Sequence, residues 1–202
     1  MVFQRINYIC NRTTKKIMKI SSIATINSGI YSSTISSGDV FYIQARDFDE
    51  NREIASNLSP VLSFTENIEK HFLTKGDILI VAKGATFLSA VYDGSYSPAV
   101  ASTVFLVICI HDKKRISPQF VSWYLNQNST QNYLLSLSRG TSIPSINKKM
   151  LMEIDIPVPS IEKQKLIIEL MSLQRKDKSL RHKIDELKEI QMNNIITNAL
   201  NN

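Results

Sequence analysis

The stretch RGTSIPSINKKMLMEIDIPVPSIEKQ, residues 139–164, is the most informative part of the chain, because it joins two kinds of sequence. Before it, short apolar runs are separated by glycine turns; after it, leucines recur every seven residues. Within it, Ser145 is placed to cap a short helix that runs to about Met152, and the apolar residues from Ile154 to Val158 then alternate as in an extended strand. Prolines stiffen this segment, so we expect a rigid hinge between a globular unit and a long helix.

The sequence after the hinge predicts one helix from about Ser160 to Leu200. Ser160 is placed to cap its first turn, where Glu162 complements the helix dipole. At about 1.5 Å per residue the helix is roughly 60 Å long, more than one domain can cover. Its residues also follow a heptad pattern. The predicted seam consists of Leu166, Leu170, Leu173, Asp177, Leu180, Ile184 and Leu187.

This seam predicts that the helix pairs with a second helix, and a homodimer supplies one. Asp177, in the apolar seam, lowers stability but restricts register. The alternative is a helix that folds back on its own domain.

Upstream, the pattern of the first 110 residues is typical of a sheet-rich fold. A buried strand is expected over 78–82, and a second over 102–110. Asp93-Gly94 between them is the best signal for a tight hairpin, since a type I′ turn needs positive φ at its centre.

Two helices are expected next. Ser117 caps the first, whose second residue is proline, and Phe120, Trp123 and Tyr124 are predicted to form its buried face. The second helix ends at Gly140, a plausible C-terminal cap.

Length and composition favour one domain with an extension. The chain has 202 residues, 43% of them hydrophobic, enough for one core. It has two cysteines, and neither an apolar leader nor an apolar run long enough to span a membrane is recognisable. We therefore expect a cytoplasmic protein, with Cys109 as a buried structural thiol.

Positive charge is unevenly distributed within the net charge of +6. Residues 1–38 and 113–152 carry basic side chains and no acid, while 39–98 are acidic on balance. Such segregation is expected for a polyanion partner, although solvated loops and helix ends would also explain it.

The order of these segments resembles one half of the DNA-specificity (S) subunit of type I restriction-modification systems. The resemblance rests on the hinge with its Gly-Thr-Ser and Pro-Val-Pro elements, on residues 18–29 at the domain entrance, and on 73–84 in the middle. It implies an α+β target recognition domain followed by a spacer helix that pairs as an antiparallel coiled coil in a dimer. The bounds expected are a basic segment at 1–16, the recognition domain at 17–159 and the helix at 160–202.

The resemblance implies recognition of double-stranded DNA, with methylation and cleavage left to methyltransferase and restriction subunits. Full-length S subunits hold two recognition domains and two helices, and this sequence holds one of each. A homodimer, a fragment and the product of a split gene all remain open.

Loop residues able to contact phosphates or base edges are the candidate DNA-binding set. For each the alternative is an ordinary solvated loop residue, and Arg46 has Asp47 and Asp49 as possible ion-pair partners. The candidates are Tyr31, Ser32, Gln44, Arg46, Lys83, Thr86, Arg139, Thr141, Ser142, Asn147 and Lys148.

No catalytic constellation is recognisable, so a non-catalytic protein without metal or cofactor is expected. The three histidines lie far from one another and form no metal-ligand spacing with the two cysteines, and no phosphate-binding glycine loop is present. Glu66, Glu69 and Lys70 suit an exposed helical face better than a nuclease site. The rival functions are a stand-alone dimeric DNA-binding regulator or anti-restriction protein, and a diverged nuclease.

Overall fold

The computed structural model describes residues 16–48, 54, 57–138 and 143–200. The chain divides into two compact units, residues 1–164 and 165–202. The described strands and short helices belong to the first unit, and the second continues the terminal helix. The predicted α+β class, a sheet-rich part followed by a long helix, is confirmed. The predicted domain limits and the pairing of the helix in a dimer stay predictions.

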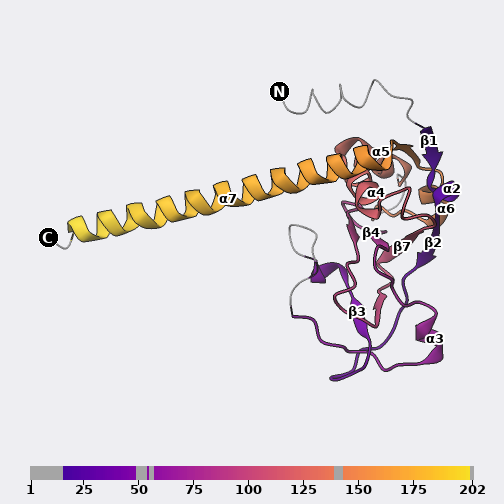
Figure 1. The fold of residues 1–202 in the computed structure, drawn as a ribbon. Helices are drawn as coiled ribbons and strands as arrows, with labels where there is room; N and C mark the ends of the chain where they lie inside the picture. The colour runs from indigo at the N-terminus through magenta and orange to yellow at the C-terminus, as the bar shows by residue number, and fades with distance from the viewer. Residues whose placement is uncertain (1–15, 49–53, 55–56, 139–142, 201–202) are drawn as a thin grey trace. The chain divides into compact units, whose positions relative to one another are not determined.

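A four-stranded antiparallel sheet of order β2-β7-β4-β5 lies at the centre of the first unit (Figure 1). Its strands are β2 (Ala24–Ser28), β7 (Phe105–Ile110), β4 (Ile78–Val81) and β5 (Ser89–Val91). β4 and β7 hold the middle, and successive residues on both of their faces are buried, as their continuous apolar runs require. The buried strand expected from residue 78 is thus confirmed, whereas the strand expected from residue 102 begins at Phe105 because a turn precedes it.

A parallel pair, β3 (Phe41–Ile43) and β6 (Ala99–Ala101), extends the core. A cluster of buried apolar side chains joins it to the central sheet through Ile43, Leu79 and Phe105. Two short helices come after β3 in the chain, η1 (Ala45–Asp47) and α3 (Glu66–Glu69). In α3 both glutamates are exposed, as the helical reading of that segment predicted.

The hairpin predicted at Asp93-Gly94 is wrong. β5 pairs with β4 and β6 pairs with β3, so the strands on either side of this turn are not partners. The turn itself has the expected chemistry: Gly94 has a φ of 84°, and the Asp93 carboxylate accepts hydrogen bonds from the backbone N–H and the hydroxyl of Ser95 at 2.9 and 2.6 Å. Local turn geometry was predicted correctly, but burial of apolar side chains elsewhere selects each strand's partner.

A two-stranded sheet joins the segment before β2 to the hinge. β1 (Lys16–Lys19) pairs with β8 (Asp155–Val158), and helices α2 (Ile20–Ile23) and α6 (Lys148–Met152) lie next to them in Figure 1. Ile154, Ile156 and Val158 are buried, which confirms their predicted alternation.

The predicted cap of the short helix α6 is wrong. The Asn147 side chain accepts a hydrogen bond from the Met150 N–H at 2.9 Å and so caps α6. Ser145 is not the cap, because α6 begins only at Lys148 and Ser145 instead forms a β-bridge with Lys83.

Helices α4 (Pro118–Leu125) and α5 (Asn128–Leu137) follow the sheet. The Ser117 side chain accepts from the Phe120 N–H, which confirms the predicted cap of α4. The predicted buried face is only partly right: Phe120 is buried with Val121 and Leu125, while Trp123 and Tyr124 are half-buried. α4 contacts β5, where the hydroxyls of Ser89 and Ser122 lie 3.1 Å apart, and this contact selects the face. Gly140, the predicted end of the second helix, lies outside the described residues.

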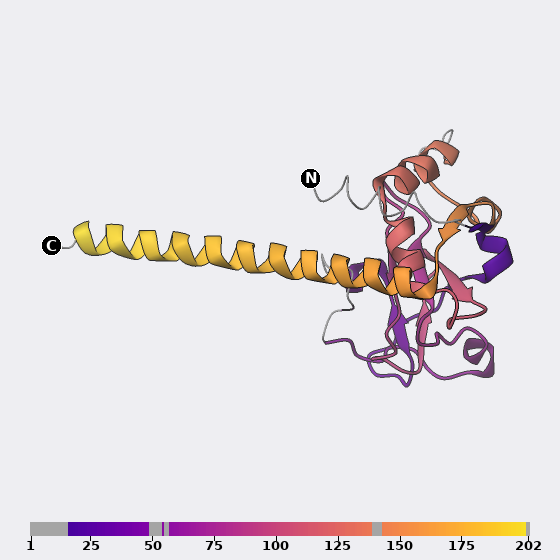
Figure 2. The ribbon, with the colours of Figure 1, turned by 45° about the horizontal axis from the view of Figure 1, so that its top comes forward.

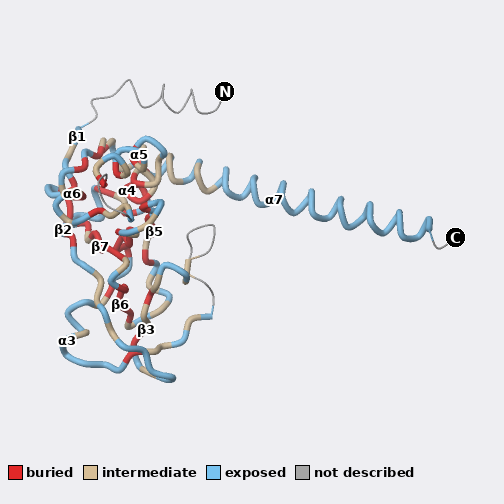
Figure 3. Tube along the Cα trace, turned by 180° about the vertical axis from the view of Figure 1, so that it is seen from behind, coloured by how far each residue is buried: buried red, intermediate tan, exposed pale blue. Residues whose placement is uncertain are grey.

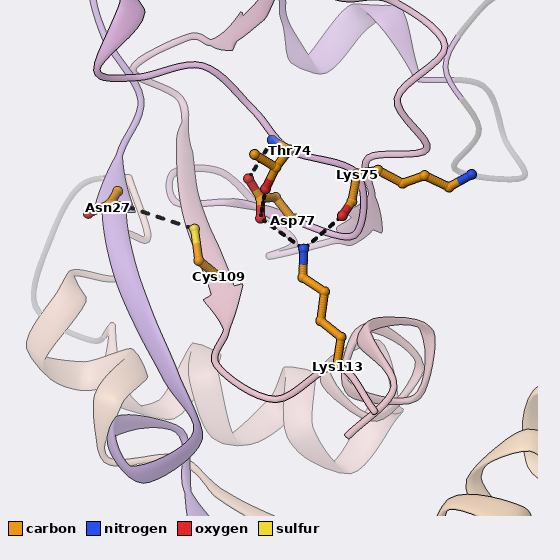
Figure 4. A network of polar contacts seen from close by, with 6 residues as sticks. All are labelled: Asn27, Thr74, Lys75, Asp77, Cys109 and Lys113. Carbon is orange, nitrogen blue, oxygen red and sulfur yellow. Dashed lines mark hydrogen bonds and ion pairs between the residues drawn. The ribbon is translucent and has the colours of Figure 1, made fainter. Parts of the chain in front are cut away.

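A polar network closes the start of β4 (Figure 4). The buried Asp77 carboxylate accepts hydrogen bonds from the Thr74 N–H at 2.8 Å and the Thr74 hydroxyl at 3.0 Å, and the Lys113 ammonium lies 3.7 Å away. Cys109 is half-buried beside this network, less than predicted, and Asn27 donates to its sulfur at 3.8 Å. Burial, with the nearby Asp77 charge, raises the pKa of the Cys109 thiol to about 11. The thiol is therefore protonated at neutral pH.

The terminal helix α7 (Ile161–Leu200) starts next to Ser160 with Glu162 in its first turn, within the predicted bounds. Beyond its first turns its residues are exposed (Figure 3), including the leucines of the heptad seam. A second view draws it as one continuous helix (Figure 2). None of the helices in the described ranges is long and apolar enough to cross a membrane.

Candidate nucleic-acid interface

One end of the four-stranded sheet gathers the loops that carry many of the predicted DNA contacts. Ser28 pairs with Leu106 and Val81 with Phe105, so β2 and β4 end where β7 begins. The loops that follow β2 and β4 therefore leave the sheet beside the turn at 102–104. We name the segments 29–33, 82–86 and 102–104 the loop end.

Gly29 makes the close packing of the loop end possible. Its N–H donates to the Phe105 carbonyl at 3.0 Å, and a Cβ on Gly29 would lie 2.0 Å from the Ser102 carbonyl oxygen. No real side chain tolerates that distance, so only glycine allows the loop to cross the turn here. The sequence marks Gly29 as a turn residue, but it contains no signal that Ser102 is the neighbour.

The next residues present two candidate side chains on a fastened backbone. Ile30 donates its N–H to the Ala101 carbonyl at 2.9 Å, and the Tyr42 hydroxyl donates to the Ile30 carbonyl at 2.9 Å. Tyr31 follows directly and is 82% exposed, and Ser32 is half-buried. A large exposed aromatic ring on a fixed backbone is suited to contact with a partner, because little conformational freedom is lost on binding.

Gln44 and Arg46 follow β3, whose end is bonded to the same turn: the Ser102 N–H donates to the Ile43 carbonyl at 2.9 Å. Gln44 is committed locally: its N–H donates to the Asp47 carboxylate at 2.7 Å, and its side chain accepts from the Asp47 N–H. Arg46 is exposed, and its Nε lies 4.0 Å from the Asp47 carboxylate. An exposed pair at this distance holds the guanidinium weakly, so Arg46 stays available while the Gln44 side chain caps η1.

Lys83 and Thr86 lie on the other side of the turn and are exposed. The Ala82 N–H donates to the Val104 carbonyl at 2.7 Å. The hinge reaches the same place, because Lys83 forms an antiparallel bridge with Ser145 and the Gly84 N–H donates to a carbonyl of the hinge at 3.0 Å. Residues about sixty positions apart in sequence are thus neighbours.

Asn147 and Lys148 follow this bridge directly. Asn147 is exposed, and its side-chain oxygen caps α6 while its amide NH₂ group points to no described acceptor. Lys148 is half-buried and Lys149 is exposed. The hinge therefore connects Asn147 and Lys148 with Lys83 and Thr86. The turn at 102–104 connects these in turn with the segments that carry Tyr31, Ser32, Gln44 and Arg46.

Some cations of the two basic segments are already paired. Lys19 forms an ion pair with Glu153, which raises the pKa of the lysine, and Lys113 pairs with the buried Asp77. These two side chains serve the fold.

Three candidates, Arg139, Thr141 and Ser142, lie outside the described residues, as does the basic segment up to residue 15. Among the residues that are described, no group of three or more His, Cys, Asp or Glu could hold a metal ion. The described candidates offer amine, guanidinium, hydroxyl and amide groups, which is the chemistry of contacts to phosphates and base edges.

The predicted dimerisation residues of α7 share one property, since every leucine and isoleucine of the seam is exposed. Asp177 is used within the helix, where its carboxylate accepts from Arg181 at 2.9 Å. The pair neutralises the one charged residue of the seam.

Comparison with known proteins agrees with this architecture. The family model of the type I restriction modification DNA specificity domain matches residues 12–189. No curated protein matches the chain. Among solved structures, the type I restriction-modification S subunit from M. genitalium is 17% identical with a TM-score of 0.56, over 82% of this chain and 40% of its own.

The HsdS subunit from Thermoanaerobacter tengcongensis is 18% identical with a TM-score of 0.59, over 90% of this chain and 48% of its own. A chain from work on complex assembly of the type I R-M system is 15% identical with a TM-score of 0.56, over 88% of this chain and 44% of its own. The chain thus spans less than half the length of each of these three solved proteins. At these identities the likeness is one of fold, and the family model, which covers most of the chain, supplies the assignment: the chain belongs to the family of type I restriction-modification DNA specificity domains.

Proposed function

We propose that this chain is a sequence-specific DNA recognition subunit of a type I restriction-modification system, in a half-length form with one target recognition domain. The observation that carries the proposal is the extent of the family match, residues 12–189, which includes most of the globular unit and most of α7. A match to the globular unit alone would be compatible with many DNA-binding proteins.

In this proposal the loop end and the adjoining residues Asn147 and Lys148 contact double-stranded DNA. Support comes from the exposed Tyr31, Arg46 and Lys83 on backbone segments joined to one turn, and from the net charge of +6. Cations there neutralise phosphates, and hydroxyl and amide groups read base edges. The chain itself supplies recognition and carries out no reaction.

The proposal also includes a homodimer through α7. An exposed seam of leucine and isoleucine on a 40-residue helix leaves apolar surface in water, and a second copy of the same helix would cover it. Because the solved S subunits are more than twice as long as this chain's matching region, two copies would restore their amount of sequence. The helices would pair antiparallel and space the two recognition domains.

Methyltransferase subunits, and restriction subunits where present, are the proposed protein partners. They would perform the chemistry at the site that the dimer selects. Two identical domains about a two-fold axis meet the same half-site on opposite strands, so the target should be an interrupted palindrome.

Methylation mapping tests this function. The chain is co-expressed with a type I methyltransferase subunit, and modified bases are mapped across the host genome. A symmetric bipartite motif is expected, and it should vanish without the chain. An asymmetric motif would contradict the homodimer and require a second, different specificity chain.

A control distinguishes the rival functions. Pure protein that binds a palindrome tightly but neither co-purifies with a methyltransferase nor directs methylation would indicate a stand-alone regulator. Metal-dependent cleavage by the pure protein would indicate a nuclease.

A further inference from the structure

We infer that Gln164 is the positioning residue for the spacer helix: its buried amide fastens the first turn of α7 to the segment that starts α4. Gln164 is the last residue of the first unit and is 0% exposed. It is the one residue of α7 that is buried among those described. A polar residue in this position must have its hydrogen bonds satisfied, because an unsatisfied buried amide is costly.

Three backbone groups satisfy the amide. Its nitrogen donates to the carbonyls of Pro159 at 2.9 Å and Arg115 at 3.1 Å, and its oxygen accepts from the Ser117 N–H at 2.8 Å. Pro159 belongs to the hinge, whereas Arg115 and Ser117 lie between β7 and α4. One side chain therefore ties the hinge and the first turn of α7 to a loop more than forty residues earlier.

This loop is itself firmly held. Ser117 caps α4 through its side chain, and α4 is bonded to β5 by the pair formed between Ser122 and Ser89. Gln164 thus connects α7 to the central sheet through α4. The proline-containing segment 157–159 limits backbone rotation at the same place.

Only glutamine meets these requirements. Glutamate has no N–H to donate and would place a charge against two carbonyl oxygens, and methionine keeps the length but forms none of the three bonds. Asparagine is one methylene shorter. The inference rests on the proposed function only in its purpose, which is to keep the two half-sites at a fixed separation; the geometric claim stands apart from DNA.

Distance measurement between two spin labels tests the claim. Labels are attached at Asn132→Cys on α5 and Lys178→Cys on α7, both exposed, in the full chain with Cys10 and Cys109 replaced by serine. Excess unlabelled protein ensures that the two labels measured belong to one chain. We expect a narrow distance distribution in the parent and one roughly twofold broader in Gln164→Met and Gln164→Glu, because the root of the helix then moves.

Gln174→Met is the matched control, because Gln174 lies on the same helix and is exposed. Its distribution should equal the parent's. The fluorescence of the single tryptophan, Trp123, reports whether the globular unit of each variant is folded.

Two outcomes would overturn the inference. One is a folded Gln164→Met whose distribution is as narrow as the parent's, which would leave Gln164 a residue of local stability only. The other is a broad distribution in the parent itself, which needs no variant to fold. A second readout, methylation of targets whose spacer is lengthened or shortened by one base pair, should be relaxed in Gln164→Met; if the proposed function fails, that readout is lost while the distance result stands.

Discussion

Strand β7 and helix α7 are both rich in large apolar residues, yet they differ in what covers them. β7 lies between β2 and β4, with Ile108 paired to Ile26 and Ile78, and its side chains are buried except for the half-buried Cys109. In α7 the seam side chains stay exposed, Leu180 to 64%. The globular unit closes its core within one chain, and the helix carries an apolar surface that only another surface can close.

This difference in burial predicts which property of the protein a substitution in each region should change. A change in β7 should act on the free energy of unfolding of the globular unit, and a change in the α7 seam should act on association.

Replacing Leu173 and Leu180 with Asp should convert the proposed dimer to a monomer. Each Asp would place an unpaired charge in an apolar seam, at a cost of several kcal/mol. Light scattering at micromolar concentration measures the change in mass. Ser172→Asp with Ser179→Asp adds the same charges outside the seam and should leave the dimer intact. A parent protein that is monomeric at this concentration would remove the basis of the prediction.

Replacing Ile108 with Ala should lower the free energy of unfolding of the globular unit by about 2–5 kcal/mol, because the side chain is 0% exposed and leaves a cavity. Denaturant titration followed by Trp123 fluorescence measures it. Leu180→Ala should change this transition by less than about 0.5 kcal/mol, as expected for an exposed residue. Equal effects of the two substitutions would show that the units are not independent.

Replacing Asn147 should distinguish capping from DNA contact. Asn147→Ala removes the cap of α6 and should lower stability by about 1 kcal/mol, whereas Asn147→Ser keeps an acceptor and should lower it by much less. If the Asn147 amide contacts DNA, both variants should weaken DNA binding to a similar extent in a titration at fixed salt. Weaker binding in the alanine variant alone would assign Asn147 to the fold.

Alkylation should be slower at Cys109 in β7 than at a cysteine placed on the exposed part of α7. Because the folded pKa is raised to about 11, the reactive thiolate is scarce at pH 8, and reaction with iodoacetamide should be slow until the pH approaches that value. The thiol of Ser179→Cys on the exposed α7 should react at the rate of an ordinary cysteine, because an exposed thiol keeps an ordinary pKa. Mass spectrometry of each peptide measures both rates, and Cys109 reacting as fast at pH 8 in the folded as in the unfolded chain would contradict the prediction.

Local features of the fold could be predicted from sequence because their causes lie within a few residues. The Ser117 cap, the buried run of β4, the alternation from Ile154 to Val158 and the long heptad helix all follow from short-range patterns. The prediction that Ser145 caps α6 was wrong. Ser145 instead forms a β-bridge with Lys83, a residue far away in sequence, and Asn147 is the cap.

For the candidate interface, sequence could nominate residue types but not their neighbours. Lys83 and Asn147 are far apart in the sequence, and the bridge between Lys83 and Ser145 brings the two segments together. Gln44 was nominated as a DNA contact, and the structure gives its side chain a capping bond that competes with that role.

Periodicity is a local property that can be recognised without knowledge of contacts, and it is sufficient to predict a sheet-rich unit followed by a long helix with an apolar heptad seam. The folded chain was needed to show that β6 pairs with β3, that Gly29 packs against Ser102, and that Gln164 bonds Arg115 and Ser117. These contacts join residues distant in the chain, and their partners are selected by which apolar faces can be buried together and which buried polar groups must then be satisfied.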